Sequence, residues 1–310
     1  MAAETVTTRT PPAQDAPAAG GRIRRAGPAT PYLFLLPYFV VFTTFVLVPA
    51  VYGLWISLHD WDYLLPGKPF VGLDNYKALF DPDSAVFGFW WESMSATGIF
   101  TVFSVPLLLV IPLLIALLLN RRFKGRTLFR AIYFAPYVLG VAVIGVLWRF
   151  LLDPNLGVVN AILGGSTPWT TAVPWAWVTL VGVTVWWTLG FNAVIYLAGL
   201  QDIPKELYEA ARIDGGGKWA EFRHVTLPGL RPVLLFVTVN TILVSANMFG
   251  QSYLITQGAP GTETRTAIMY IAQVGLADYK MGSAAAMSYL LTACLLVISV
   301  IVFRLFREKS

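Results

Sequence analysis

The sequence predicts an all-α membrane protein that crosses the bilayer six times and carries one folded polar segment between its fourth and fifth crossings. Three observations lead to this prediction. Only 13% of the 310 residues are charged and 56% are hydrophobic, whereas soluble domains carry roughly 25% charged residues. Apolar runs long enough to cross a bilayer, roughly 20 residues each, recur along the chain. The connections between these runs differ sharply in their content of lysine and arginine.

The N-terminal segment differs in composition from everything that follows it. It is rich in alanine, proline, threonine and glycine and contains no apolar stretch. Such a segment cannot bury enough apolar surface to fold by itself. We therefore expect residues 1–30 to form a disordered cytoplasmic tail and residues 31–310 to form one transmembrane domain.

Six apolar runs are predicted to cross the membrane as helices. Their few charged residues lie near the ends of the runs, where long side chains reach the membrane interface. The predicted spans are residues 32–58, 95–120, 127–152, 174–200, 230–255 and 284–306. A shorter apolar run at residues 267–276 cannot reach across the bilayer. We expect it to form a helix at the outer surface.

The distribution of basic residues predicts the orientation of the chain. Of the 22 lysines and arginines, seventeen fall on the side that holds both termini and the polar segment. The other side has only Lys68, Lys77, Arg149, Arg265 and Lys280. Cytoplasmic loops carry the excess of basic residues, so both termini and the polar segment are expected in the cytoplasm. The same rule accounts for the pI of about 9.3, and no nucleic-acid partner is predicted.

The residues that perform most chemistry are scarce. Cys294 is the only cysteine, and His59 and His224 are the only histidines. An internal disulfide or a thiolate metal cluster is therefore impossible, and we predict neither a metal site nor catalytic residues. The spans lack titratable residues near their centres, which argues against a proton-coupled carrier or a channel.

The polar segment, residues 206–230, is predicted to form two short helices around a glycine turn. Asp202 is expected to cap the first helix, and Pro204 is tolerated in its first turn. Gly215, Gly216 and Gly217 are expected to end that helix, because glycine adopts the positive φ of a helix stop. The apolar face of the second helix is marked by Trp219, Phe222 and Val225.

This segment has two possible roles. An amphipathic helix that lies on the lipid surface would explain its pattern. A docking site for a cytoplasmic partner is the alternative. The small side chains of Ala210 and Ala211 would allow close approach, and Glu209 would offer a carboxylate to a basic residue of that partner.

The polar segment resembles the "EAA loop" of permeases from binding-protein-dependent ABC importers. The matching residues are Glu209-Ala210-Ala211, then Gly215, then a run from Val225 through Thr226 and Leu227 to Pro228. The usual pattern has isoleucine in place of Val225. Further stretches look like the sugar-importer branch of that family, namely GLDNYKALF (72–80), LFRAIYFAPYVLGVAVIGVLWRFLLDPNLGVVN (128–160), YLAGLQDIPKELYEAARIDG (196–215) and YLITQGAPGTET (253–264).

The resemblance implies a type I ABC importer permease fold for residues 31–310, with the polar segment as a coupling helix. The expected coupling residues are Glu209, Ala210, Ala211, Asp214, Gly215, Leu227 and Pro228. The chain has no P-loop motif, so ATP and Mg²⁺ are expected in partner ATPase subunits and no cofactor is expected in this chain. The implied partners are a second homologous permease, two ATPase subunits, an extracytoplasmic sugar-binding protein and membrane lipid.

Transporter sites lie near mid-membrane at breaks in helices, and the fourth and fifth spans offer aromatic, hydroxyl and amide groups there. The candidate substrate-binding residues are Trp187, Thr188, Phe191, Asn192, Thr241, Ser245, Asn247, Met248 and Gln251. Each could instead bond its own backbone, bridge two helices or anchor a helix at the interface. The resemblance implies import of a neutral sugar or oligosaccharide across a bacterial cell membrane. A permease for glycerol 3-phosphate or a polyol, a non-ABC carrier and an intramembrane enzyme are the alternatives.

Overall fold

The computed structural model describes residues 30–121 and 123–307. The predicted tail at residues 1–30 lies outside these ranges except for Thr30. Throughout the described ranges the secondary structure is helical, apart from two isolated β-bridges. One bridge lies within the connection that follows the first long helix, and the other joins this connection to Lys280. The chain divides into one unit that ends at Val51 and another that begins at Tyr52, and each is described by itself.

The first unit is one apolar helix. It consists of α1 (Thr30–Phe42), a π-helical turn (Thr43–Leu47) and the start of α2 (Val48–Ser57). From Tyr32 to Ser57 the helix is long and apolar enough to cross a membrane, and no residue in its most apolar stretch is buried within the structure. This element matches the first predicted span.

The second unit is a helical bundle around α4 (Phe87–Asn120) and α8 (Trp175–Asp202), which pack along each other. α12 (Arg231–Ala246) packs against both of them and against α14 (Met281–Arg307). One face of α4 is buried and carries small residues such as Ala96, Ser104 and Ala116. The opposite face exposes large apolar side chains. In a membrane helix, small residues allow close packing and the large apolar face contacts lipid.

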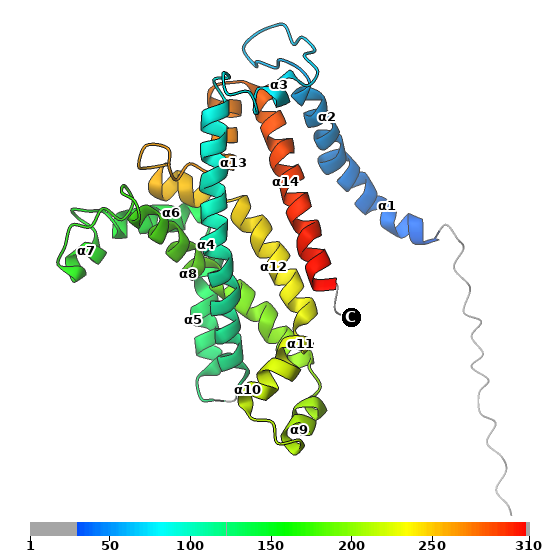
Figure 1. The fold of residues 1–310 in the computed structure, drawn as a ribbon, viewed down its shortest axis with the longest axis vertical. Helices are drawn as coiled ribbons and strands as arrows, with labels where there is room; N and C mark the ends of the chain where they lie inside the picture. The colour runs from blue at the N-terminus through cyan, green and yellow to red at the C-terminus, as the bar shows by residue number, and fades with distance from the viewer. Residues whose placement is uncertain (1–29, 122, 308–310) are drawn as a thin grey trace, which may run out of the picture. The chain divides into compact units, whose positions relative to one another are not determined.

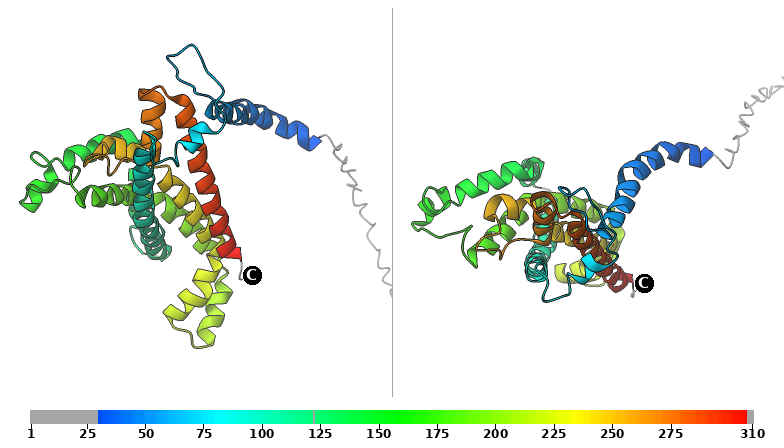
Figure 2. Two further views of the ribbon diagram at one scale, coloured as in Figure 1. Left: turned by 45° about the horizontal axis from the view of Figure 1, so that its top comes forward. Right: turned by 90° about the horizontal axis from the view of Figure 1, so that it is seen from above.

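Shorter helices complete the second unit (Figure 1). Their bounds are α3 (Asp74–Lys77), α5 (Arg126–Val138), α6 (Val141–Leu151), α7 (Val158–Leu163), α9 (Lys205–Ile213), α10 (Lys218–Glu221), α11 (Leu227–Gly229) and α13 (Ala267–Ala272). Three π-helical turns lie at Phe222–Thr226, Ser252–Thr256 and Gln273–Ala277. α9, α10 and α11 form the end of the bundle opposite α3 and α13, and the tilted view in Figure 2 shows the same arrangement.

The number of membrane crossings depends on two bent helix pairs. Within the described residues, four helices are long and apolar enough to span a bilayer, and six spans result if each bent pair forms one. The third predicted span is not one straight helix, because α5 and α6 meet at 97°. Pro136 lies one turn before this bend and Gly140 lies in it, and both residue types interrupt helices.

The fifth predicted span also differs from the structure. α12 ends at Ala246 and not at Ile255, and a 68° bend at Leu230 separates it from the helical segment 218–229. One other boundary changes as well. The second predicted span begins earlier than residue 95, because α4 begins at Phe87. The short apolar run predicted at residues 267–276 is helical in the structure, as α13 and the π-helical turn that follows it, and α13 packs against α4 and α14.

One glycine explains how α5 reaches the bundle. A Cβ atom on Gly190 of α8 would lie 2.4 Å from the carbonyl oxygen of Tyr133 in α5. Real Cβ atoms do not approach backbone atoms this closely, so any other residue would push the two helices apart. Gly190 therefore permits the packing of α5 on α8.

Candidate functional site

The polar segment forms a helical hairpin whose turn is built from glycine. We call residues 205–229 the polar hairpin; its first arm is α9, and its second arm runs from α10 to α11. Gly215 has φ +81°, donates its N–H to the Arg212 carbonyl at 3.0 Å, and is followed by Gly216, whose N–H reaches the Ala211 carbonyl at 2.8 Å. These two bonds define a Schellman motif, which ends α9 with a residue in the left-handed region.

Two side-chain contacts join the arms of the polar hairpin. Arg212 Nε lies 2.8 Å from Glu221 Oε1, and the hydroxyl groups of Tyr208 and Thr226 are 3.1 Å apart. The hydrogen bond from Arg212 lowers the pKa of the Glu221 carboxyl group, and the same contact raises the pKa of the Arg212 guanidinium. A carboxyl group with a lowered pKa stays ionised at neutral pH. The ion pair is therefore complete there and is lost only as the pH falls through that lowered pKa.

The polar hairpin leaves large apolar side chains in solvent. Leu207 is 51% exposed, Ile213 86% and Trp219 70%. An isolated helix pair that buried its own apolar face would hide these groups, so this surface is available to another molecule. These exposed side chains belong to the end of the bundle that is farthest from α3 and α13 (Figure 1).

The structure places the predicted coupling residues on this hairpin. Glu209, Ala210 and Ala211 lie in α9, Asp214 and Gly215 form its C-terminal turn, and Leu227 and Pro228 lie in α11. One expectation was wrong. Asp202 does not cap α9; it is the last residue of α8, and the N-cap position of α9 is occupied by Pro204. Only Ile203 and Pro204 connect the two helices.

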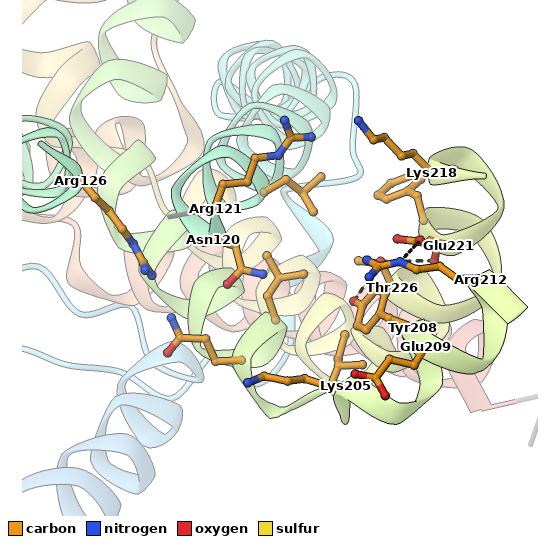
Figure 3. Close-up of a pocket in the computed structure, with 15 residues that line it drawn as sticks. Asn120, Arg121, Arg126, Lys205, Tyr208, Glu209, Arg212, Lys218, Glu221 and Thr226 are labelled. Atoms are coloured by element: carbon orange, nitrogen blue, oxygen red, sulfur yellow. Dashed lines mark hydrogen bonds and ion pairs between the residues drawn. The ribbon is translucent and has the colours of Figure 1, made fainter. Parts of the chain in front are cut away.

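A cavity of about 1020 Å³, the hairpin chamber, lies between the polar hairpin and the ends of the long helices. Figure 3 shows Arg121, which directly follows α4, and Arg126, the first residue of α5, across the chamber from Lys205, Arg212 and Lys218 of the hairpin. Two carboxylates, Glu209 and Glu221, also line it. The basic residues outnumber the acidic ones, which gives the chamber a positive potential.

A second cavity lies between α4, α8 and α12, and we call it the central cavity. Its volume is about 150 Å³. Seven of the nine predicted substrate-binding residues line it. They are Thr188, Phe191, Asn192, Thr241, Ser245, Met248 and Gln251.

Polar pairs cross the helix interfaces around the central cavity. Asn192 Nδ2 of α8 donates to Thr241 Oγ1 of α12 at 3.3 Å and to a backbone carbonyl of α4 at 3.0 Å. Ser104 of α4 donates to Ser245 of α12 at 3.2 Å. These groups bridge helices, as polar residues in membrane bundles often do. Their remaining lone pairs and N–H groups are what the cavity can offer to a ligand.

Two predicted residues do not line the central cavity. The indole N–H of Trp187 donates to the Leu139 carbonyl at 3.0 Å, which lies in the break between α5 and α6. Trp187 thus satisfies a carbonyl group that the break removes from the helix ladder. Asn247 is exposed and donates Nδ2 to the Leu243 carbonyl at 2.8 Å, at the C-terminal end of α12.

Six residues that were absent from the candidate set also line the central cavity. They are Phe100, Leu108, Tyr137, Thr184, Asn240 and Val244. The most informative is Tyr137, whose ring stacks on that of Phe191 with centroids 4.9 Å apart and an interplanar angle of 21°. Tyr137 directly follows Pro136 at the break of the third span. The proline followed by a glycine four residues later was the signal that could have located it.

Comparison with known proteins assigns the chain to a class of membrane transport subunits. Residues 84–307 match the model of the family described as "Binding-protein-dependent transport system inner membrane component". The trehalose/maltose transport system permease protein MalF of Thermococcus litoralis is 36% identical over 259 residues, which are 82% of this chain and 86% of that protein. The sn-glycerol-3-phosphate transport system permease protein UgpA of Yersinia pestis is 34% identical over 90% of this chain and 94% of its own length.

A solved structure supports the fold. A bacterial ABC transporter involved in the import of the acidic polysaccharide alginate aligns with a TM-score of 0.73 at 23% identity, over 90% of this chain and 95% of the other. This chain belongs to the family of binding-protein-dependent transport system inner membrane components. It is an ABC importer permease, a mostly helical multi-pass membrane protein and a transport component rather than an enzyme.

Proposed function

We propose that this chain is one permease subunit of an ATP-driven importer that moves a neutral sugar or oligosaccharide into the cytoplasm. An extracytoplasmic binding protein delivers the sugar, a second homologous permease completes the pathway, and two ATPase subunits bind ATP and Mg²⁺. Both termini and the polar hairpin face the cytoplasm. The 36% identity to a trehalose/maltose permease supports the substrate class.

One observation carries the proposed coupling mechanism. The first arm of the polar hairpin follows α8 directly, and the second arm continues through the bend at Leu230 into α12. α8 and α12 are the two helices that supply most of the polar lining of the central cavity. A force applied to the hairpin by a closing ATPase therefore reaches both walls of the cavity through the backbone alone.

The first test is the ATPase activity of the whole complex. The permease pair, the ATPase subunits and the binding protein are purified together and exposed to trehalose, maltotriose and glycerol 3-phosphate. We expect a neutral saccharide to stimulate hydrolysis and this chain alone to hydrolyse no ATP. Stimulation by glycerol 3-phosphate alone would favour the alternative that the identity to UgpA supports. No stimulation by any saccharide would contradict the proposed substrate class.

The second test concerns the central cavity. Tyr137→Ala removes the ring that stacks on Phe191, and aromatic contacts of this kind contribute about 0.5–1.5 kcal/mol beyond area burial. We expect sugar uptake to fall about tenfold while the complex still assembles. Phe134→Ala is the matched control. The ring centroids of Phe134 and Tyr137 are 5.8 Å apart, but Phe134 does not line the cavity. Equal losses in the two variants would show that packing, and not contact with sugar, explains the effect.

A further inference from the structure

A separate pocket of about 490 Å³ opens between the first turns of α4, the first turn of α8 and the loop that precedes α13. Its position at the start of α4 puts it at the end of the bundle opposite the polar hairpin (Figure 1). We call it the Trp91–Trp177 pocket. Its lining includes Trp91, Glu92, Ser95, Trp177, Thr262 and Glu263.

The Trp91–Trp177 pocket combines two indole rings with two carboxylates. The Trp91 ring is held in place, because its indole N–H donates to the Leu79 carbonyl at 2.8 Å. Thr262 Oγ1 donates to Glu92 Oε2 at 3.2 Å. The second carboxylate, Glu263, is exposed. Within the described ranges neither carboxylate forms an ion pair.

This set of groups has the chemistry of a saccharide site. Ligand pockets use aromatic surfaces for contact area and a few placed polar groups for orientation. An indole ring covers the apolar C–H face of a sugar ring. An ionised carboxylate only accepts hydrogen bonds, so it pairs with the hydroxyl groups of a sugar through strong, charge-assisted bonds.

The pocket is aligned with the central cavity along the same helices. On α8, Trp177 lies seven, eleven and fourteen residues before Thr184, Thr188 and Phe191, so all four occupy one helix face. Seven residues of α-helix rise about 10 Å, a distance that linked sugar units can span. On α4, Ala96 lines the pocket, and Phe100, four residues later on the same helix face, lines the central cavity.

The charge of the pocket selects among ligands. Two carboxylates that form no ion pair with any described residue repel a phosphate or a uronic acid and accept a neutral sugar. The nearest cation along the chain, Arg265, is 7% exposed and its guanidinium stacks over the rings of Phe89 and Tyr270. It is not part of the pocket lining.

We propose that the Trp91–Trp177 pocket is a second saccharide subsite, which holds a neutral sugar ring of an oligosaccharide whose other end occupies the central cavity. The proposal rests on the proposed import function and adds a preference for neutral chains of more than two units. An acidic chain or a phosphorylated polyol is disfavoured at this subsite.

The experiment uses the complete complex in lipid, with Cys294→Ala in this chain and Ser95→Cys added. A methanethiosulfonate reagent reports access to the pocket, and trehalose, maltotriose and glycerol 3-phosphate are the probes. We expect Ser95→Cys to react and maltotriose to protect it. Asp83→Cys, at an exposed loop position outside the pocket lining, should react equally with and without sugar.

A second measurement separates a subsite from a structural role. In Glu92→Gln, we expect the maltotriose concentration for half-maximal ATPase stimulation to rise about tenfold, the effect of losing one charge-assisted hydrogen bond. The value for trehalose, a disaccharide that the proposal assigns to the central cavity alone, should stay unchanged. Glu263→Gln should behave in the same way.

The outcomes distinguish the two proposals. If no saccharide stimulates the ATPase, the import function is contradicted and the subsite is contradicted with it. If maltotriose stimulates the ATPase but does not protect Ser95→Cys, the subsite alone is overturned. The same conclusion follows if a partner subunit blocks the reagent, or if Glu92→Gln changes trehalose and maltotriose equally.

Discussion

Gly215→Val tests whether the polar hairpin couples ATP hydrolysis to transport. No atom lies within 4 Å of the position that a Cβ on Gly215 would take, so the substitution creates no steric clash. Its cost comes from the backbone, because φ is +81°. A residue with a side chain pays roughly 1–2 kcal/mol in the left-handed region, and a β-branched residue fits it worst. The native turn should therefore lose roughly 5–30-fold in population relative to open alternatives.

We expect this loss to reduce coupling and to leave sugar selection intact. The central cavity is lined by α4, α8 and α12, and Gly215 touches none of its residues. In the purified complex, ATPase subunits should either be lost or hydrolyse ATP without control by sugar. Co-purification and sugar-dependent hydrolysis are the two measurements.

The three consecutive glycines supply matched controls. Gly217 has φ −76° and no atom within 4 Å of its Cβ position, so Gly217→Ala should behave like wild type. Gly216→Ala would place a Cβ 2.6 Å from the Ala211 carbonyl oxygen and should disrupt the turn by a clash. If Gly215→Val binds the ATPase normally and responds normally to sugar, the hairpin is only a surface element and the coupling argument fails.

Three further predictions concern the hairpin, the topology and the bundle. Arg212→Gln and Glu221→Gln should each weaken coupling, and the double variant should be no worse than either single one. Because the pKa of Glu221 is lowered, the contribution of the Arg212–Glu221 ion pair to coupling should be independent of pH near neutrality and should disappear on strong acidification. In a cysteine-free background, Gly217→Cys should react with an impermeant reagent only from the cytoplasm and Asp83→Cys only from outside, and the reverse pattern would overturn the orientation. Gly190→Ala should lower the thermal stability of the purified complex, because its Cβ would meet the Tyr133 carbonyl at 2.4 Å, and unchanged stability would contradict the described α5–α8 packing.

The polar hairpin was predictable from sequence because its structure is local. Glycine preferences and the 3.6-residue period fix the two arms and the turn without any distant contact. The prediction of the N-cap of α9 was wrong for a related reason. Asp202 suits a cap by residue type, yet α8 extends through Asp202 and leaves only Ile203 and Pro204 between the two helices.

The central cavity was predictable only in part because it depends on where helices break. Thr188, Asn192, Thr241 and Ser245 were found from polar groups on two spans. Tyr137 was missed because a hydropathy run does not reveal that α5 and α6 diverge by 97°. The apolar α4 residues that line the cavity are indistinguishable in sequence from the apolar residues that face lipid.

The packing next to the polar hairpin indicates which segments would move together during coupling. Leu230, at the bend between the hairpin and α12, is fully buried in a cluster that also contains Leu200 of α8 and Ile203 of the connection to α9. Tyr208 and Val225 of the hairpin pack against this cluster. Close-packed apolar groups of this kind move together and do not deform continuously. The hairpin and the adjoining ends of α8 and α12 are therefore expected to shift as one body.

The C-terminal end of α12 is not continuous with the helical segment that follows it. The α-helix stops at Ala246, and Asn247 interrupts the backbone pattern before the π-helical turn at Ser252–Thr256. Met248 and Gln251, on the far side of this interruption, line the same cavity as Thr241 and Ser245, on the near side. A displacement that α12 transmits as a rigid rod changes the distance between these two groups. We therefore expect the helix break to convert movement of the hairpin into a change of cavity shape at the place where the sugar is proposed to bind.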